Sequence, residues 1–364
     1  MRQLATPWAK ELWSALAAHV GGDAVKANRL FRVFNRALPL SYTRSVASAM
    51  IAADVVQLDD LLAQRTTSGS IGAELVVSGD GSDTSPFSAQ LRVYQIATKV
   101  NLTTLLPTVH DFGLSAKSSV ATEIVLSGDT QTTCFIDAFD LVVNDAAHAA
   151  TLKTNGPLIS AAFPRILGGS LESDGLHALT FTAGLTWLAV DILRALMRYS
   201  RQLPLHLDES RVLELMLSVP TLCGDLYALF DAHHHPRRLA GEDGDDASSS
   251  AHARTVAATR ARVVEQIAAL QTSEEDLVFR TLHELIEACV RTSAYGTAAR
   301  VSAGRGHVIA FKLDSSKVPL LPEPRPLWEI YVHARNVEGA RACVCVCVCV
   351  CGFCDGPLSR FFKQ

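Results

Sequence analysis

The chain has 364 residues, of which 48% are hydrophobic and 19% charged, and its net charge is −4. This composition excludes an intrinsically disordered chain and a small disulfide-stabilised protein, and at about 150 residues per domain the length predicts two or three domains. The charge gives no basic field for nucleic acid or an anionic membrane, and the apolar stretch 176–190 is too short and too polar to span a bilayer. We therefore expect neither nucleic acid nor a membrane as a partner.

The first twenty residues predict an amphipathic helix, since a leucine or tryptophan recurs every four residues. No apolar stretch follows Arg2, so no secretory signal is expected. Arg2 and Lys10 are opposed only by Glu11, a pattern that a mitochondrial leader would share, although an ordinary surface helix is the simpler interpretation. We expect an intracellular protein, mitochondrial in preference to cytoplasmic.

Helices with a break at Pro39 are expected over residues 23–64, and the Ser-, Gly-, Thr- and Asp-rich residues 66–88 predict a loop or hairpin. From residue 89 the pattern changes to strand, helix, strand, strand, with a second helix over 153–172. This order is the start of a ferredoxin-like α/β unit. Its first four elements are expected at Gln90–Ala97, 102–109, Ser119–Leu126 and Thr133–Val143.

Beyond residue 174 the chain is predicted to be helical. Apolar residues three or four positions apart run from Leu176 to Met197, which indicates one deeply buried helix. Arg194, Arg198 and Arg201 form a basic stripe near its end, which we interpret as a solvated face. Residues 236–250 predict a polar loop, and Thr272 with Glu275 forms a capping box before the next helix.

Two strands are expected at His307–Leu313 and Leu327–Val332, joined by a proline-rich connector. Two strands alone do not make a stable sheet. We therefore expect a further α/β domain to begin here.

Six of the nine cysteines lie between Cys343 and Cys354, where cysteine and valine alternate. As a strand, the run would place its thiols on one face, and Cys-x-Cys spacing can bind soft metals. A TG dinucleotide repeat, however, translates as alternating Cys and Val in any frame. We favour a translated repeat that interrupts the true sequence near Ala342. The other cysteines, Cys134, Cys223 and Cys289, are predicted to be buried hydrophobes in a reducing compartment.

No motif for phosphate binding or nucleophilic catalysis is evident. The glycines at 79–81, 168–169 and 304–306 lack the spacing of a dinucleotide site. His233–His235 is interpreted as a surface tract at a helix end, because adjacent helical residues point about 100° apart. His110–Asp111 is assigned to a polar loop, and no base accompanies Cys289. We accordingly predict no catalytic, cofactor-binding or metal-binding residue in this chain.

Several ordered stretches nevertheless resemble the large NAD-specific glutamate dehydrogenases of bacteria and protists. The resemblance runs, with gaps, from about residue 28 to 340. It is most specific near the C-terminal end, where the chain reads Phe311-Lys-Leu-Asp-Ser315 and then Pro324-Arg-Pro-Leu-Trp-Glu-Ile-Tyr-Val332. The other stretches are Phe31–Pro39, Ala53–Leu61, Val109–Leu114, Glu172–Leu176, Ala183–Trp187 and Leu193–Gln202.

The resemblance implies an enzyme that deaminates L-glutamate oxidatively to 2-oxoglutarate and ammonia with NAD as cofactor. It implies ACT-like modules over the ferredoxin-like unit, and such modules bind amino-acid effectors or mediate homo-oligomer formation. The catalytic lysines and the Rossmann domain of the family would follow the point where the Cys-Val run begins. This chain is thus expected to be an inactive N-terminal regulatory and assembly part that binds no NAD. The alternative is a stand-alone ACT-like module that binds an amino acid.

The predicted fold class is α+β: an ACT-like α/β unit, a mainly helical domain and the first strands of a further α/β domain. The expected domains are an N-terminal helical segment at 1–65, the ACT-like domain at 66–172, the helical domain at 173–300, the start of the catalytic-domain sheet at 301–342 and the Cys-Val tail at 343–364.

Overall fold

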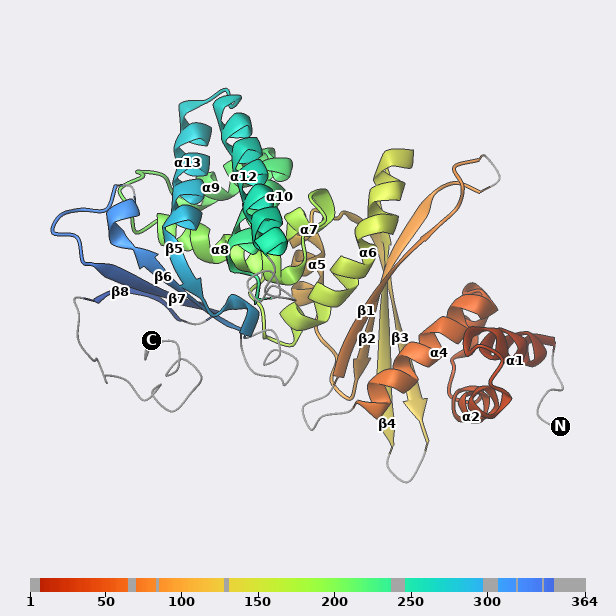
Figure 1. Cartoon of the computed structure of the whole chain (residues 1–364). Helices are drawn as coiled ribbons and strands as arrows, with labels where there is room; N and C mark the ends of the chain where they lie inside the picture. Colours follow the sequence, from red (N-terminus) through yellow and green to blue (C-terminus); the bar gives the residue numbers. More distant parts are fainter. Residues whose placement is uncertain are drawn as a thin grey trace. The chain divides into compact units, whose positions relative to one another are not determined.

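The computed structural model describes two compact units, Met1–Gly168 and Gly169–Gln364, which are treated separately below (Figure 1). Both contain helices and antiparallel sheet, so the α+β class is confirmed. For residues 246–251 and 337–343 only the backbone is described. The described residues are 7–64, 70–82, 85–127, 131–236, 246–296, 307–318, 320–335 and 337–343.

Four helices open the first unit: α1 (Pro7–His19), α2 (Ala24–Phe34), α3 (Leu40–Ser45) and α4 (Ser48–Ala63). Leu12 and Leu16 of α1 are fully buried, so the amphipathic pattern of the N-terminus builds part of the core. Asp23 caps α2 by accepting hydrogen bonds from two backbone N–H groups of its first turn, which satisfies donors that a helix start leaves open.

The sheet of the first unit contains β1 (Ser70–Ser78), β2 (Ser88–Ile96), β3 (Ala116–Leu126) and β4 (Thr132–Leu141), with α5 (Leu102–Asp111) and α6 (Ala146–Leu167). The strands are antiparallel in the order β1-β2-β4-β3. The ferredoxin-like order is present in a permuted form. The edge strand next to β2, which would ordinarily follow the second helix, precedes the unit as β1. Part of the predicted loop or hairpin at 66–88 is therefore this strand.

Helices cover both faces of β1. On one face a Cβ at Gly72 would lie 3.0 Å from Leu61 of α4, and on the other face Leu75 packs against Gly156 of α6. The face towards α4 also buries an ion pair. Arg92 Nη2 lies 2.6 Å from Asp54 Oδ2, and Tyr94 donates a hydrogen bond of 2.8 Å to the same carboxylate. This pair fixes α4 on the sheet.

The turn after β1 depends on a glycine. Gly79 has φ +89°, and an added Cβ would lie 2.2 Å from the carbonyl oxygen of Pro86. We expect Gly79→Ala to lower the free energy of unfolding by about 3 kcal/mol, because a left-handed backbone and a backbone clash act together. Gly21→Ala is the matched control, since φ is +68° there and nothing lies within 4 Å. It should cost about 1 kcal/mol in the same urea titration; equal costs would contradict the clash.

The second unit combines a helical bundle with a second antiparallel sheet in the order β5-β6-β7-β8. Almost every residue of α8 is buried. The elements are η1 (Gly175–His177), α7 (Ala178–Thr182), α8 (Trp187–Ser200), α9 (Glu209–Ser218), α10 (Pro220–His234), α12 (Asp246–Ala268), α13 (Ser273–Ala288), β5 (Cys289–Thr292), β6 (Val308–Asp314), η2 (Ser315–Lys317), β7 (Trp328–Ala334) and β8 (Val337–Cys343).

The single long helix expected from Leu176 to Met197 is wrong. Gly184 adopts φ +65°, which ends α7, and the side chain of Thr186 then caps the start of α8. The polar loop expected at 236–250 is also partly wrong, since α12 begins at Asp246; residues 237–245 lie outside the described residues. The capping box of Thr272 and Glu275 is confirmed.

Within the described residues, length and composition permit no single helix to cross a membrane, whereas α9 and α10 meet those criteria only as a pair bent by 96°.

Candidate functional site

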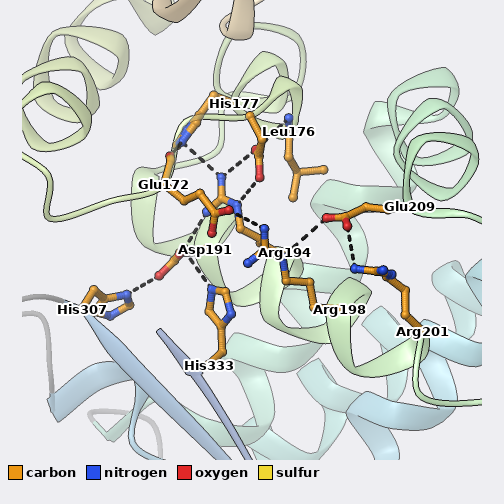
Figure 2. Close-up of polar contacts among 11 residues, drawn as sticks. Glu172, Leu176, His177, Asp191, Arg194, Arg198, Arg201, Glu209, His307 and His333 are labelled. Carbon is orange, nitrogen blue, oxygen red and sulfur yellow. Dashed lines mark hydrogen bonds and ion pairs between the residues drawn. The ribbon is translucent and has the colours of Figure 1, made fainter. Parts of the chain in front are cut away.

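A cluster of buried charged side chains lies around Arg194 in the second unit (Figure 2). We call it the Arg194 cluster. Its side chains come from the segment before α7, from α8, and from the two central strands of the sheet or the residue before them. The members are Asp174, His177, Asp191, Arg194, His307 and His333.

Arg194 forms ion pairs with two carboxylates. Its Nε and Nη2 donate hydrogen bonds of 2.6 and 2.9 Å to the two oxygens of Asp174, and its Nη1 donates one of 2.6 Å to Asp191. The arginine is 0% exposed. The planar guanidinium suits this arrangement because its donors form a rigid fork.

Local structure explains how both carboxylates reach Arg194. Asp191 lies one turn earlier on α8, and residues three apart share a helix face. Asp174 caps η1 by accepting a hydrogen bond of 3.1 Å from the backbone N–H of Leu176, which fixes its side chain. His177, at the end of η1, places Nε2 3.1 Å from Arg194 Nη2 and 2.8 Å from the carbonyl oxygen of Glu172.

The same aspartate ties α8 to the sheet. Asp191 is hydrogen-bonded to His307, the residue before β6, and one of its oxygens lies 3.7 Å from His333 Nε2 on β7. The ring of Trp187 at the start of α8 meets the His307 ring edge-on at 5.4 Å. A second tie lies one turn after Arg194, where Tyr199 donates a hydrogen bond of 2.6 Å to Glu329 on β7.

Burial and charge oppose each other in this cluster. Burial acts to raise the pKa of Asp191, but the hydrogen bond with His307, the nearby His333 ring and the charge of Arg194 outweigh it and hold that pKa well below its usual range. Asp174 likewise has a lowered pKa, because Arg194 outweighs its burial. Burial, assisted by the charge of Arg194, lowers the pKa of His177 to about 4, so its ring is neutral at pH 7. Both carboxylates are therefore ionised.

The prediction of a solvated basic stripe is wrong for Arg194. Exposure increases only towards the end of α8. Arg198 is 13% exposed and pairs with Glu172, whereas Arg201 is 40% exposed and lies 2.6 Å from Glu209. Arg194 is buried, and its partners are Asp174, His177 and Asp191. An aspartate at position 191, inside an apolar run, was the signal that a buried partner exists.

The single residues that the sequence analysis weighed as candidates for chemistry lie outside the Arg194 cluster. His233 lies in the last turn of α10 beside Glu287, with Nε2 3.4 Å from Oε1. The assignment of His110–Asp111 to a polar loop is wrong, since both residues belong to the last turn of α5, where His110 is exposed. Cys289 is buried at the start of β5, and burial raises the pKa of its thiol. Across the described ranges, no group of three or more His, Cys, Asp or Glu side chains is arranged to hold a metal ion. Gly304–Gly306 and the Cys-Val run after Cys343 lie outside the described residues.

The cluster is a buried network of ion pairs and hydrogen bonds whose charges compensate one another. Its carboxylates are ionised and engaged by a guanidinium and by imidazole rings, so their charge is already compensated inside the protein. Removing one partner of such an arrangement leaves an uncompensated buried charge, which is strongly destabilising.

Three domain families match the chain, in order along the sequence. The ACT3 domain of glutamate dehydrogenase matches residues 78–154, and helical motif 3 of glutamate dehydrogenase matches residues 171–236. The catalytic domain of bacterial NAD-glutamate dehydrogenase matches residues 262–346. This chain is a relative of the NAD-specific glutamate dehydrogenases. The predicted family resemblance is thereby confirmed.

Whole proteins of the family give the same result. The NAD-specific glutamate dehydrogenase of Halomonas elongata is 26% identical over 338 residues, and that of Pseudomonas aeruginosa is 24% identical over 328 residues. These alignments cover 93% and 90% of this chain but only 19% of each relative. The Mycobacterium tuberculosis protein of the same name is 31% identical over 194 residues, which are 53% of this chain and 11% of that protein. The chain thus spans about a fifth of the two longer matches.

The Arg194 cluster joins two of these matched parts of the chain. Asp191 and Arg194 lie in the part that matches helical motif 3, and His307 and His333 lie in the part that matches the catalytic domain. The cluster therefore connects the part that matches helical motif 3 to strands β6 and β7 of the part that matches the catalytic domain.

Proposed function

We propose that this chain is a regulatory and assembly part of an NAD-dependent glutamate dehydrogenase. The intact enzyme would deaminate L-glutamate oxidatively to 2-oxoglutarate and ammonia and pass the hydride to NAD. The observation that carries the proposal is the order of the three matches along one chain, from the ACT3 domain through the helical motif to the catalytic domain. Alignment of 93% of the chain with one fifth of a relative supports it.

The geometry supports an assembly role for the helical part. Asp191 on α8 engages His307 and His333, and Tyr199 on the same helix engages Glu329. These contacts fix β6 and β7 against α8. Contacts of this kind would fix the position of the catalytic-domain sheet relative to the helical part, and a precise active site requires rigid support.

Neither strand-to-helix connection of the first unit has the features of a dinucleotide site. A dinucleotide site needs a glycine-rich turn between a strand and a helix start whose N–H groups face the phosphates. The segment between β4 and α6 has no glycine, and Asp145 already accepts the N–H of His148 there. The segment between β2 and α5 also lacks glycine. We therefore propose that NAD binds to parts of the intact enzyme outside this chain.

The proposal has a direct test. The purified chain, incubated with L-glutamate and NAD, is expected to form no NADH above the blank when absorbance at 340 nm is followed. Oxidative deamination needs a proton-transfer group, cations for two carboxylates and a nicotinamide site in one place. The full-length enzyme of Halomonas elongata, assayed in parallel, is the positive control. If the chain alone forms NADH in a glutamate-dependent way, the proposal that it is inactive by itself is wrong.

The ACT3 match favours a second candidate function, a stand-alone module that binds an amino acid. Isothermal titration of the whole chain with L-glutamate and then with the other amino acids tests for binding, and an assay for activity in cells that lack the dehydrogenase separates the two functions. Saturable heat together with cellular activity independent of any dehydrogenase would favour the module. No saturable heat with any amino acid would leave the assembly role.

A further inference from the structure

A second cluster of charged and titratable side chains lies where α10, α12 and α13 meet, around Glu287 of α13. Arg260 of α12 donates two hydrogen bonds of 2.8 Å, from Nε and Nη2, to the two oxygens of this carboxylate. His233 of α10 and His283 of α13 place Nε2 3.4 and 3.9 Å from its Oε1. We call these four residues the Glu287 cluster.

The Glu287 cluster is a second connection between parts of the chain that match different domain families. His233 lies in the part that matches helical motif 3, whereas His283 and Glu287 lie in the part that matches the catalytic domain. The side chains of Glu287 and Arg260 are 27% and 41% exposed. Solvent protons therefore reach this connection, in contrast to the buried Arg194.

A buried histidine adjoins the cluster. His234 follows His233 in the last turn of α10, and its ring packs against that of Phe230 with the centroids 4.7 Å apart. Its Nε2 is buried and has no hydrogen-bond partner among the described residues. Burial, assisted by the neighbouring His233, lowers the pKa of His234 to about 4. The ring is therefore neutral at pH 7.

The carboxylate of the cluster stays ionised over the range in which histidines titrate. Burial acts to raise the pKa of Glu287, but the nearby His233 ring and the hydrogen bonds of Arg260 outweigh it and lower that pKa to about 2. Acid between pH 7 and 4 consequently changes the charge of histidines at this site and leaves that of Glu287 as it is.

His283 also resists protonation in the folded chain. Burial lowers its pKa; Glu287 opposes this shift, and the charges of Arg260 and Arg280 add to it. Arg280 and Glu284, both on α13, line a small cavity together with His283. A proton on His283 thus lies among cations, and Glu287 is already engaged by Arg260.

We propose that the Glu287 cluster and His234 form a pH-sensitive switch, which holds the last turn of α10 against α12 and α13 at neutral pH and releases it in acid. Protonation of His234 and His283 adds two positive charges beside Arg260. A charged His234 also needs hydration, which its buried position does not give. Opening of the last turn supplies that hydration, and a helix end opens at lower cost than the core.

The direction of the switch follows from proton binding. His234 has a pKa of about 4 in the folded chain against an ordinary value of 6.5, so an opened turn binds a proton more tightly than a closed one. The contribution of this group to closure is complete above pH 6.5 and is lost as the pH falls towards 4. The switch uses residues of this chain alone and does not depend on the proposed enzymatic function.

Hydrogen exchange of the full chain at pH 7 and pH 5, followed by mass spectrometry with labelling times scaled to the intrinsic exchange rate, tests the proposal. From pH 7 to pH 5, the backbone N–H groups of Asp231–His235 should lose at least about tenfold more protection than those of α8. His234→Phe and His283→Gln should each reduce this excess loss at least about threefold, because each removes a titrating ring.

His206→Asn is the matched control, since His206 is exposed in the same unit and asparagine also adopts its left-handed backbone. It should lose protection in α10 as the wild type does, and circular dichroism melting at pH 7 checks that each variant is folded. Protection retained at pH 5 in either of the two cluster variants would support the switch. A wild-type last turn that keeps its protection at pH 5 would overturn it, as would an equal loss in the wild type and both variants.

Discussion

Replacing Arg194 by methionine is expected to lower the free energy of unfolding of the second unit by about 3–5 kcal/mol. Methionine has a similar length but leaves the carboxylates of Asp174 and Asp191 without their cation in a buried site. Urea titration followed by circular dichroism measures the change. Hydrogen exchange should place it in α8, β6 and β7, which the cluster connects.

Arg201→Met is the matched control for this experiment. Arg201 also lies 2.6 Å from a carboxylate, that of Glu209, but its side chain is 40% exposed. Exposed ion pairs contribute at most about 1 kcal/mol. If the two methionine variants lose equal stability, the ion pairs of the Arg194 cluster contribute no more to the free energy of unfolding than an exposed ion pair does.

The second large effect concerns pH. His177 has a pKa of about 4 in the folded chain against an ordinary value of 6.5, because burial disfavours its charged form. Between these two values the unfolded chain binds a proton that the folded chain does not. Stability from this group is therefore complete above pH 6.5 and falls as the pH drops towards 4, by up to roughly 3 kcal/mol.

Unfolding free energies measured at pH 7, 6, 5 and 4 check this expectation. In His177→Gln the decline between pH 6.5 and 4 should shrink by up to roughly 3 kcal/mol, since the titrating group is gone. Asp174 and Asp191 act at lower pH: their pKa values are depressed, so their contribution is complete above about 3.8 and is lost as the pH falls further. An unchanged decline in His177→Gln would show that another group causes it.

Periodicity predicted most of the first sheet. The alternation in β2, β3 and β4 and the helical spacing in α5 and α6 are local signals, and the structure confirms these elements. For residues 66–88 the sequence predicted only a loop or hairpin, and β1 is the first strand of such a hairpin with β2. Its cover comes from α4 and α6, which no local pattern reveals. Gly184 ends α7 within a run whose apolar spacing continues through it, so the break was hidden as well.

The Arg194 cluster could be predicted only in part. Asp191 and Arg194 are neighbours on one helix face, and this spacing is visible in the sequence. His307 is 116 positions from Asp191, and nothing in either segment indicates that they meet. Arg194 is engaged by Asp174 and His177, which precede it by 20 and 17 residues outside its own helix, so the spacing within the helix suggested a solvated stripe instead.

The permuted order of the first sheet has a consequence for synthesis. Because the strand that flanks β2 is translated first, every strand of this sheet has been made once β4 is complete, and α6 is the last element that the unit requires. Domains fold largely as units, the N-terminal one first, as the chain emerges from the ribosome. Residues 1–168 can thus reach their native state co-translationally, before α8 and its arginine exist.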